Sequence, residues 1–109
     1  MKNLYGLIGY RLEHSFSKQY FNQKFERENI ANSYYDLFEL DTITEFSNLL
    51  QTQPTLKGLN VTIPYKEQIL PFLDEIDSKA QKIGSVNVIK INSKGKTKGF
   101  NSDYYGFYT

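Results

Sequence analysis

Cysteine is absent from this sequence and histidine occurs once, and these two shortages exclude several kinds of site. Without cysteine the chain forms no disulfide bond and offers no thiolate to a metal. A single histidine, His14, cannot build a histidine-based metal cluster. No apolar run approaches the length that crosses a bilayer, and the first residues lack the pattern of a signal peptide. We therefore expect a cytoplasmic protein with no metal site and no membrane partner.

The chain also lacks an excess of charge of either sign. Its 13 basic and 12 acidic residues are well mixed and leave a net charge of +1. Nucleic acids and anionic membranes select strongly basic surfaces, so neither is an expected partner. The seven glycines nowhere form a G-x-G-x-x-G pattern, and no Walker A pattern occurs. The sequence therefore shows no nucleotide or dinucleotide cradle of its own.

What is present suits one compact domain. The 109 residues are 39% hydrophobic and 16% aromatic, which is enough for a core. The predicted strands cover residues 4–9, 33–40 and 56–61, and a predicted hairpin joins residues 86–91 to residues 96–100. Four helices are expected between or beside them: one from Ser15 or Ser17 to about Asn29, one after the capping box Thr42-x-x-Glu45, one opened by Pro64 and limited by Pro71, and one through Ile76, Ala80 and Ile83 that stops at Gly84.

Strands that alternate with helices predict a three-layer α/β/α domain. We expect a mostly parallel sheet plus an antiparallel C-terminal hairpin, with residues 103–109 opening a further helix. Three polar clusters follow predicted strands: one around Ser15, one from Thr62 to Lys66, and one from Asn101 to Asp103. Such sheets bind ligands beyond the carboxyl ends of their strands, so these clusters outline a pocket for a small molecule.

Lys66 is the residue with the clearest chemical potential. A lysine held at a strand-to-helix corner can donate or accept a proton, although most helix lysines are simply solvated. Asp103 can pair with it and keep the ammonium charged, or it can cap the last helix. Ser15 and Ser17 can bind a carboxylate at a helix N-terminus, or serve only as N-caps. His14 is interpreted as structural.

Amide side chains supply the remaining candidates. Asn60, Asn87 and Asn101 can hydrogen-bond the hydroxyls of a polyol. Asparagines at turns and strand ends are also commonly structural, so each one alone indicates little. The tyrosine pairs at 34–35 and 104–105 are interpreted as packing residues.

Taken in order, these motifs resemble the N-terminal, substrate-binding domain of shikimate dehydrogenase. The matching pieces are His14-Ser15-x-Ser17 after Gly9, then Gly58-Leu59-Asn60-Val61-Thr62-Ile63-Pro64-Tyr65-Lys66, then Gly84-Ser85-Val86-Asn87, then Gly99-Phe100-Asn101-Ser102-Asp103 and Gly106-Phe107. They lie in family order across nearly the whole chain. The chain departs from the family pattern beside these motifs, for example at Lys18, Val88 and Tyr104, which leaves the choice between shikimate and quinate open.

The resemblance implies an activity and a set of roles. The family reduces 3-dehydroshikimate to shikimate with NADPH in aromatic amino-acid biosynthesis. It implies that Lys66 and Asp103 form the catalytic pair. The implied substrate-binding residues are these two together with Ser15, Ser17, Thr62 and Asn87, and we add Asn60 as a substrate-binding candidate because of its amide.

Family members continue into a Rossmann domain that binds NADP. We therefore expect residues 1–109 to be the substrate domain alone, inactive without that cofactor domain. The alternatives are a stand-alone binding module for shikimate-like or quinate-like hydroxy-carboxylates, and a purely structural domain. Exposed aromatic residues and sheet edges also permit a homodimer.

Overall fold

The chain folds around one mixed sheet of six strands. The computed structural model describes residues 3–10, 12 and 16–102, and at residues 16 and 17 it describes the backbone only. The strand order is β2-β1-β3-β5-β6-β4. In chain order the elements are β1 (Asn3–Gly9), α1 (Phe16–Arg27), β2 (Ser33–Glu39), α2 (Glu45–Thr52), β3 (Leu56–Val61), α3 (Tyr65–Gln68), the 3-10 helix η1 (Leu70–Phe72), β4 (Glu75–Ile76), α4 (Ser78–Ile83), β5 (Val88–Ile91) and β6 (Thr97–Phe100).

The strand pairing confirms the predicted fold class. β1 lies between β2 and β3 and is parallel to both. β5 is antiparallel to β3, and β5 and β6 form the predicted antiparallel hairpin. The short strand β4 then runs parallel to β6. The carboxyl ends of β1, β3 and β6 and the amino end of β5 therefore lie at the same end of the sheet. This row of strand ends is called the sheet edge below, in distinction from the outer strands β2 and β4.

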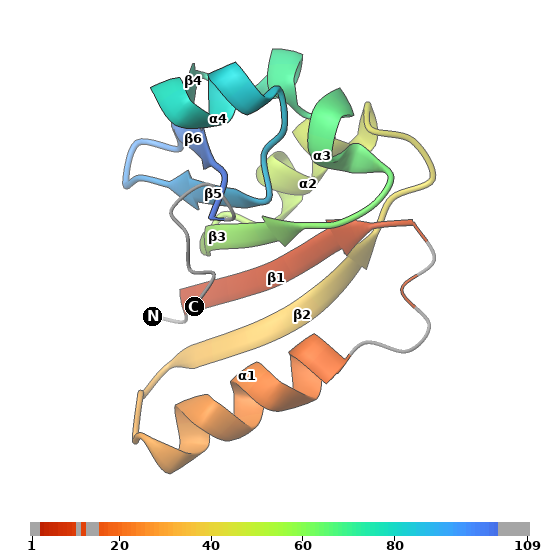
Figure 1. The fold of residues 1–109 in the computed structure, drawn as a ribbon. Helices are drawn as coiled ribbons and strands as arrows, with labels where there is room; N and C mark the ends of the chain where they lie inside the picture. The colour runs from red at the N-terminus through yellow and green to blue at the C-terminus, as the bar shows by residue number, and fades with distance from the viewer. Residues whose placement is uncertain (1–2, 11, 13–15, 103–109) are drawn as a thin grey trace.

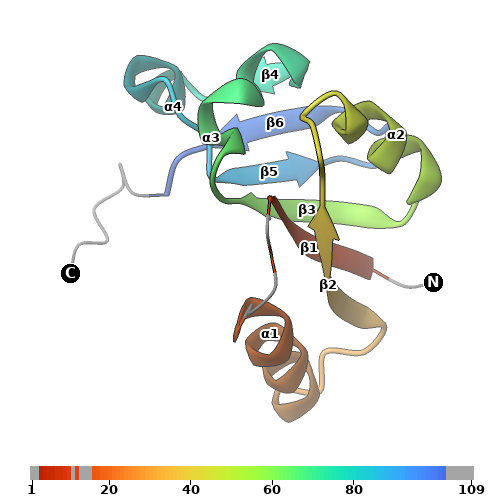
Figure 2. The same cartoon turned by 90° about the vertical axis from the view of Figure 1, so that its right-hand side faces the viewer.

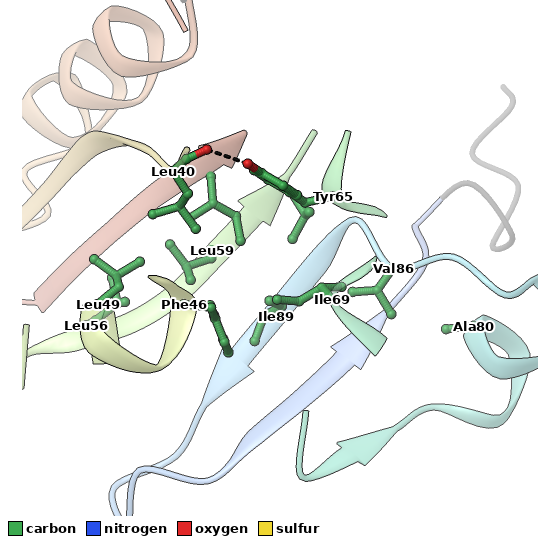
Figure 3. Packing of buried hydrophobic residues seen from close by; sticks show 12 residues of the cluster. Leu40, Phe46, Leu49, Leu56, Leu59, Tyr65, Ile69, Ala80, Val86 and Ile89 are labelled. Atoms are coloured by element: carbon green, nitrogen blue, oxygen red, sulfur yellow. Dashed lines mark hydrogen bonds between the residues drawn. The ribbon is translucent and has the colours of Figure 1, made fainter. Parts of the chain in front are cut away.

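Helices lie on both faces of the sheet, as a three-layer domain requires. α2, α3 and α4 lie on one face, whereas α1 lies on the other, over β2 and β1 (Figures 1 and 2). The first face carries the core, in which Ile8, Phe46, Ile69, Val86 and Ile89 are fully buried (Figure 3). Because apolar burial is the main driving force for folding, this face stabilises the sheet edge that carries the candidate residues.

Local signals explain where the helices begin and end. The expected capping box forms in part, since the Thr42 N–H donates to Glu45 Oε2 at 3.1 Å and α2 begins at Glu45. α1 ends at Arg27, and Asn29 takes a positive φ of 54° just after it, close to the predicted end. Gly84, with φ 78°, terminates α4 as expected, because the left-handed region favours glycine.

Two expectations were wrong in detail. Ile76 was assigned to the helix that ends at Gly84. In the structure it belongs to β4 and pairs with Gly99 of β6, and α4 begins only at Ser78. Asp77 sets this boundary, because its carboxylate accepts a hydrogen bond from the Lys79 N–H at 3.2 Å. We also expected a helix of about two turns between Pro64 and Pro71, but α3 has only four residues and passes into η1, which contains Pro71.

Asp74 fastens the segment between η1 and β4 to β6. Its Oδ2 accepts from the Thr97 N–H at 2.8 Å and from the Thr97 hydroxyl at 3.1 Å, and the Asp74 N–H donates to Thr97 Oγ1 at 3.0 Å. Thr97 is buried, so these bonds also satisfy its polar groups. The hydrogen bonds from Thr97 hold the pKa of Asp74 below its usual value.

We predict that Asp74→Asn removes part of the acid sensitivity of the fold. Because the pKa of Asp74 is lower in the folded chain than in the unfolded one, its contribution is complete above about pH 4 and is lost as the pH falls through the folded pKa. Urea unfolding between about pH 2 and pH 7 measures this effect. Glu26→Gln, which removes an exposed carboxylate from α1, is the control. An Asp74→Asn variant with the wild-type pH dependence would contradict the prediction.

Candidate functional site

The candidate residues after β3, before β5 and after β6 lie together at the sheet edge described above. Asn87 is the centre of this group. The Val61 N–H donates to the Asn87 carbonyl at 2.9 Å, and the Asn87 N–H donates to the Phe100 carbonyl at 3.0 Å. These two backbone bonds hold Asn87 between the end of β3 and the end of β6. Thr62 and Ser102 each follow shortly after a strand that Asn87 contacts.

Thr62 is held against the end of β1. Its N–H donates to the Ile8 carbonyl at 2.9 Å. The neighbouring residue Gly9 is buried, and a Cβ atom at Gly9 would lie 2.4 Å from Thr62 Cγ2 and 3.1 Å from the Ile63 carbonyl oxygen. Real Cβ atoms do not approach so closely, so glycine at this position allows the threonine to pack over β1.

The corner between β3 and α3 fixes the backbone of Lys66. The Ile63–Pro64 peptide bond is cis, and the Tyr65 N–H donates to the Thr62 carbonyl at 3.0 Å. The Tyr65 ring is 3% exposed, and its hydroxyl donates to the Leu40 carbonyl (Figure 3). Burial raises the pKa of Tyr65, with Glu45 and Asp41 adding to the rise, so the phenol keeps its donor proton. On the other side, the Val86 N–H donates to the Lys66 carbonyl at 2.8 Å.

The Lys66 side chain is half-buried. Lys18 forms an ion pair with Asp36 at 3.3 Å and Lys98 forms one with Glu75 at 4.0 Å, and neither pair involves Lys66. The partner expected from the sequence, Asp103, lies outside the described residues, as do Ser15 and His14. Ser17 lies in the first turn of α1, but its side chain is not described.

The amide of Asn87 binds Ser102. The Ser102 N–H donates to Asn87 Oδ1 at 2.9 Å, and Asn87 Nδ2 donates to Ser102 Oγ at 3.0 Å. Asn101, which is 4% exposed, donates from Nδ2 to the Ser85 carbonyl at 3.0 Å. These contacts fasten the chain that leads to residue 103 onto the segment that carries Asn87. Sequence reasoning missed this role of Ser102, whose only signal was a hydroxyl residue between two motif positions.

Asn60 faces the opposite side of the sheet from the core. Its Oδ1 accepts from the Tyr35 hydroxyl at 2.9 Å, and the Tyr35 ring stacks on Phe21 of α1 with centroids 4.6 Å apart. Asn60 and Thr62 are two residues apart on an extended chain, so their side chains point to the same side. The structure thus brings Asn60, Thr62, Lys66 and Asn87 to one end of the sheet, with Asn60 already bonded to Tyr35.

A large hollow in the described structure lies elsewhere. It has a volume of about 1230 Å³, and its lining residues place it on the α1 side of the sheet, over β3, β5 and β6. Its apolar lining includes Tyr5, Phe25, Val88 and Phe100. It reaches Asn60 but not Thr62, Lys66 or Asn87. Within the described part of the chain, no group of acidic or histidine side chains could hold a metal, and no helix is long and apolar enough to span a membrane.

Comparison with known families agrees with the motif order. Residues 7–89 match the family model described as the shikimate dehydrogenase substrate binding domain. The chain belongs to the shikimate dehydrogenase family. The match covers both Thr62 and Asn87, whereas β6 and Ser102 lie beyond the matched residues.

Individual members of the shikimate dehydrogenase family are similar along nearly the whole chain. The NADP(+) shikimate dehydrogenase of Clostridium perfringens is 45% identical over 106 residues, which are 95% of this chain and 38% of that protein. The crystal structure of shikimate dehydrogenase 1 from Peptoclostridium difficile superimposes with a TM-score of 0.84 at 39% identity, covering 97% of this chain and 39% of that one. The Thermus thermophilus enzyme in complex with shikimate has a TM-score of 0.84 at 27% identity, covering 97% of this chain and 40% of that one. This chain therefore spans less than half the length of these relatives.

We predict that Gly9→Ala destabilises the domain and that Thr62→Ser relieves part of the cost. Forcing a methyl group into this contact should cost about 1–3 kcal/mol of unfolding free energy. Thr62→Ser removes the Cγ2 atom that the new methyl would strike at 2.4 Å. Denaturant unfolding of the wild type, both single variants and the double variant measures the coupling. Gly58→Ala is the control, because a Cβ there meets its nearest neighbours at 3.4 Å. Strictly additive costs would contradict the proposed contact.

Proposed function

We propose that this chain is the substrate-binding part of an NADP-dependent shikimate dehydrogenase that interconverts 3-dehydroshikimate and shikimate. The observation that supports this best is a pair of backbone hydrogen bonds at one sheet edge. Val61, next to Thr62, donates to Asn87, and Val86, next to Asn87, donates to Lys66. The family match supports the same substrate class. The related Thermus thermophilus enzyme, which was crystallised in complex with shikimate, points to the same ligand.

The proposed substrate contacts divide by chemistry. Ser15 and Ser17, near the N-terminus of α1, bind the carboxylate, because free N–H groups and the helix dipole favour negative charge there. Asn60, Thr62, Asn87 and Asp103 bind the ring hydroxyls. In the described structure the Asn60 and Asn87 amides contact Tyr35 and Ser102, so a ligand would share or replace these bonds.

Lys66 and Asp103 are the proposed catalytic pair. When hydride adds to the carbonyl carbon of 3-dehydroshikimate, the two electrons of the carbonyl π bond move to oxygen. An ammonium beside that oxygen stabilises the developing negative charge and can deliver the proton that completes the hydroxyl. Asp103 holds the ammonium charged and oriented. The anchored backbone of Lys66 limits how far this long side chain can move.

The hydride comes from NADPH, which we assign to a separate domain of a longer protein. The relatives named as NADP(+) enzymes are more than twice as long as this chain. The uncovered hollow over β3, β5 and β6 is consistent with further polypeptide packing on that half of the sheet. We therefore propose that residues 1–109 alone bind substrate but do not turn it over.

Binding is tested by titrating the 109-residue chain with shikimate and, separately, with quinate. We expect backbone amide shifts at Thr62, Asn87 and Ser102 with millimolar or tighter affinity for the preferred ligand. Amide shifts confined to residues lining the hollow over β5 and β6 would move the site away from the proposed edge. An absence of binding to either ligand at millimolar concentration would contradict the proposed substrate class.

Catalysis is tested by Lys66→Ala in a version of the protein that includes the NADP domain. Loss of a positioned acid or base should lower turnover by at least about 100-fold. Shikimate affinity should change much less, because several other residues hold the substrate. Lys82→Ala, an exposed lysine on α4, is the matched control. Unchanged turnover in Lys66→Ala would remove Lys66 from the mechanism, and binding without any turnover in the longer protein would favour the non-catalytic binding module.

A further inference from the structure

The outer edge of β2 is covered in an unusual way. In the parallel ladder with β1, alternate residues of β2 direct their backbone groups towards β1, and the others direct them outwards. The Leu40 N–H donates to the Gly9 carbonyl and the Asn3 N–H donates to the Asn32 carbonyl, so even-numbered positions face β1. The outward backbone groups therefore belong to Ser33, Tyr35, Leu37 and Glu39.

The side chain of Asn22 bonds both outward groups of Tyr35. The Tyr35 N–H donates to Asn22 Oδ1 at 2.8 Å, and Asn22 Nδ2 donates to the Tyr35 carbonyl at 3.0 Å. A primary amide has the same acceptor and donor as a backbone peptide group. Asn22 thus makes at the middle of β2 the pair of hydrogen bonds that a neighbouring strand would make.

Other contacts along α1 support this closure. Lys18, four residues before Asn22 and so on the same helix face, pairs with Asp36 at 3.3 Å. Asp36 Oδ1 also accepts from the outward N–H of Leu37 at 2.8 Å. Phe21 stacks on the Tyr35 ring. Three consecutive residues of β2 are thereby engaged. Asn22 bonds the backbone of Tyr35, Lys18 pairs with the side chain of Asp36, and that side chain bonds the N–H of Leu37.

We propose that Asn22 blocks the β2 edge against a second copy of this chain. Unpaired edge strands invite strand addition, and natural proteins close them with helices, charges or short strands. A symmetric pair of β2 strands would be antiparallel and isologous, with Tyr35 opposite Tyr35 of the other copy and Ser33 opposite Leu37. Asn22 occupies the central pair of backbone groups that this arrangement needs.

The edge itself has the composition that makes such a block useful. Residues 33–39 read Ser-Tyr-Tyr-Asp-Leu-Phe-Glu, with three aromatic residues in seven. Aromatic residues favour strands and strand pairing. The opposite edge of the described sheet is β4, which has only two residues and so offers little to a partner. β2 is therefore the described edge at which a second copy would pair once Asn22 is removed.

The test compares Asn22→Ala with Gln23→Ala, an exposed neighbour on the same helix. Residue-resolved hydrogen exchange of the dilute proteins should show the Tyr35 amide exchanging about tenfold faster in Asn22→Ala, with the inward amide of Asp36 unchanged. Sedimentation velocity over a concentration series should show Asn22→Ala forming a dimer that neither the wild type nor Gln23→Ala forms. In that dimer the outward amide of Ser33 should gain protection.

Asn22→Asp keeps the acceptor for the Tyr35 N–H but lacks the donor to its carbonyl, and it serves if Asn22→Ala does not fold. Asn22→Asp should leave the Tyr35 amide protected and should associate less than Asn22→Ala. If Asn22→Ala is unfolded, the comparison is with the wild type, and Asn22→Asp should associate more than the wild type. A wild-type chain that already dimerises with Ser33 protected would overturn the proposal. So would variants that remain monomeric at every concentration, or a dimer that leaves Ser33 unprotected.

Discussion

The candidate site depends on the position of Asn87 between two strands. Its carbonyl accepts from Val61 at the end of β3, and its N–H donates to Phe100 at the end of β6. Neighbouring strands in a sheet lie about 4.8 Å apart, so β3 and β6 are separated by about 10 Å, with Asn87 between them. Thr62 and Ser102, which follow the two strands, are placed by the same ladder, so backbone pairing sets the distance between them.

The core stabilises this arrangement from the side of α2 and α3. Tyr65 is buried among core residues and bonds the Leu40 carbonyl, while the next residue, Lys66, receives a hydrogen bond from Val86, which is itself fully buried. The backbone of the proposed catalytic lysine is thus fixed by neighbours that are themselves immobilised by packing. A positioned ammonium costs little reorganisation when charge develops on the substrate, which is how a preorganised site lowers a barrier.

The sequence predicted the elements better than the contacts between them. β3 was expected at residues 56–61 and is found there, where Leu56, Leu59 and Val61 are buried. Ile76 was misassigned because Ile76, Ala80 and Ile83 have helical spacing, whereas Asp77 is the stronger start signal and Ile76 gains a strand partner in Gly99. The amide of Asn87 was expected to bind a ligand, yet its partner Ser102 lies 15 residues away in sequence. Periodicity carries no information about such pairs, and the contact of Gly9 with Thr62 is hidden for the same reason.

On the face of the sheet that carries α1, one half is covered by the helix and the other half is hollow. α1 covers β2 and β1, while the hollow over β3, β5 and β6 leaves Val88 and Phe100 as part of an apolar surface. The ammonium groups of Lys90 and Lys98 lie over the Phe100 ring, 5.2 and 5.6 Å from its centre. This hollow reaches Asn60 but not Thr62, Lys66 or Asn87. Polypeptide packed into the hollow would complete the burial of the sheet face and still leave those three residues open to a substrate and to a cofactor domain. Among the proposed substrate residues that the structure describes, the hollow therefore overlaps the site only at Asn60.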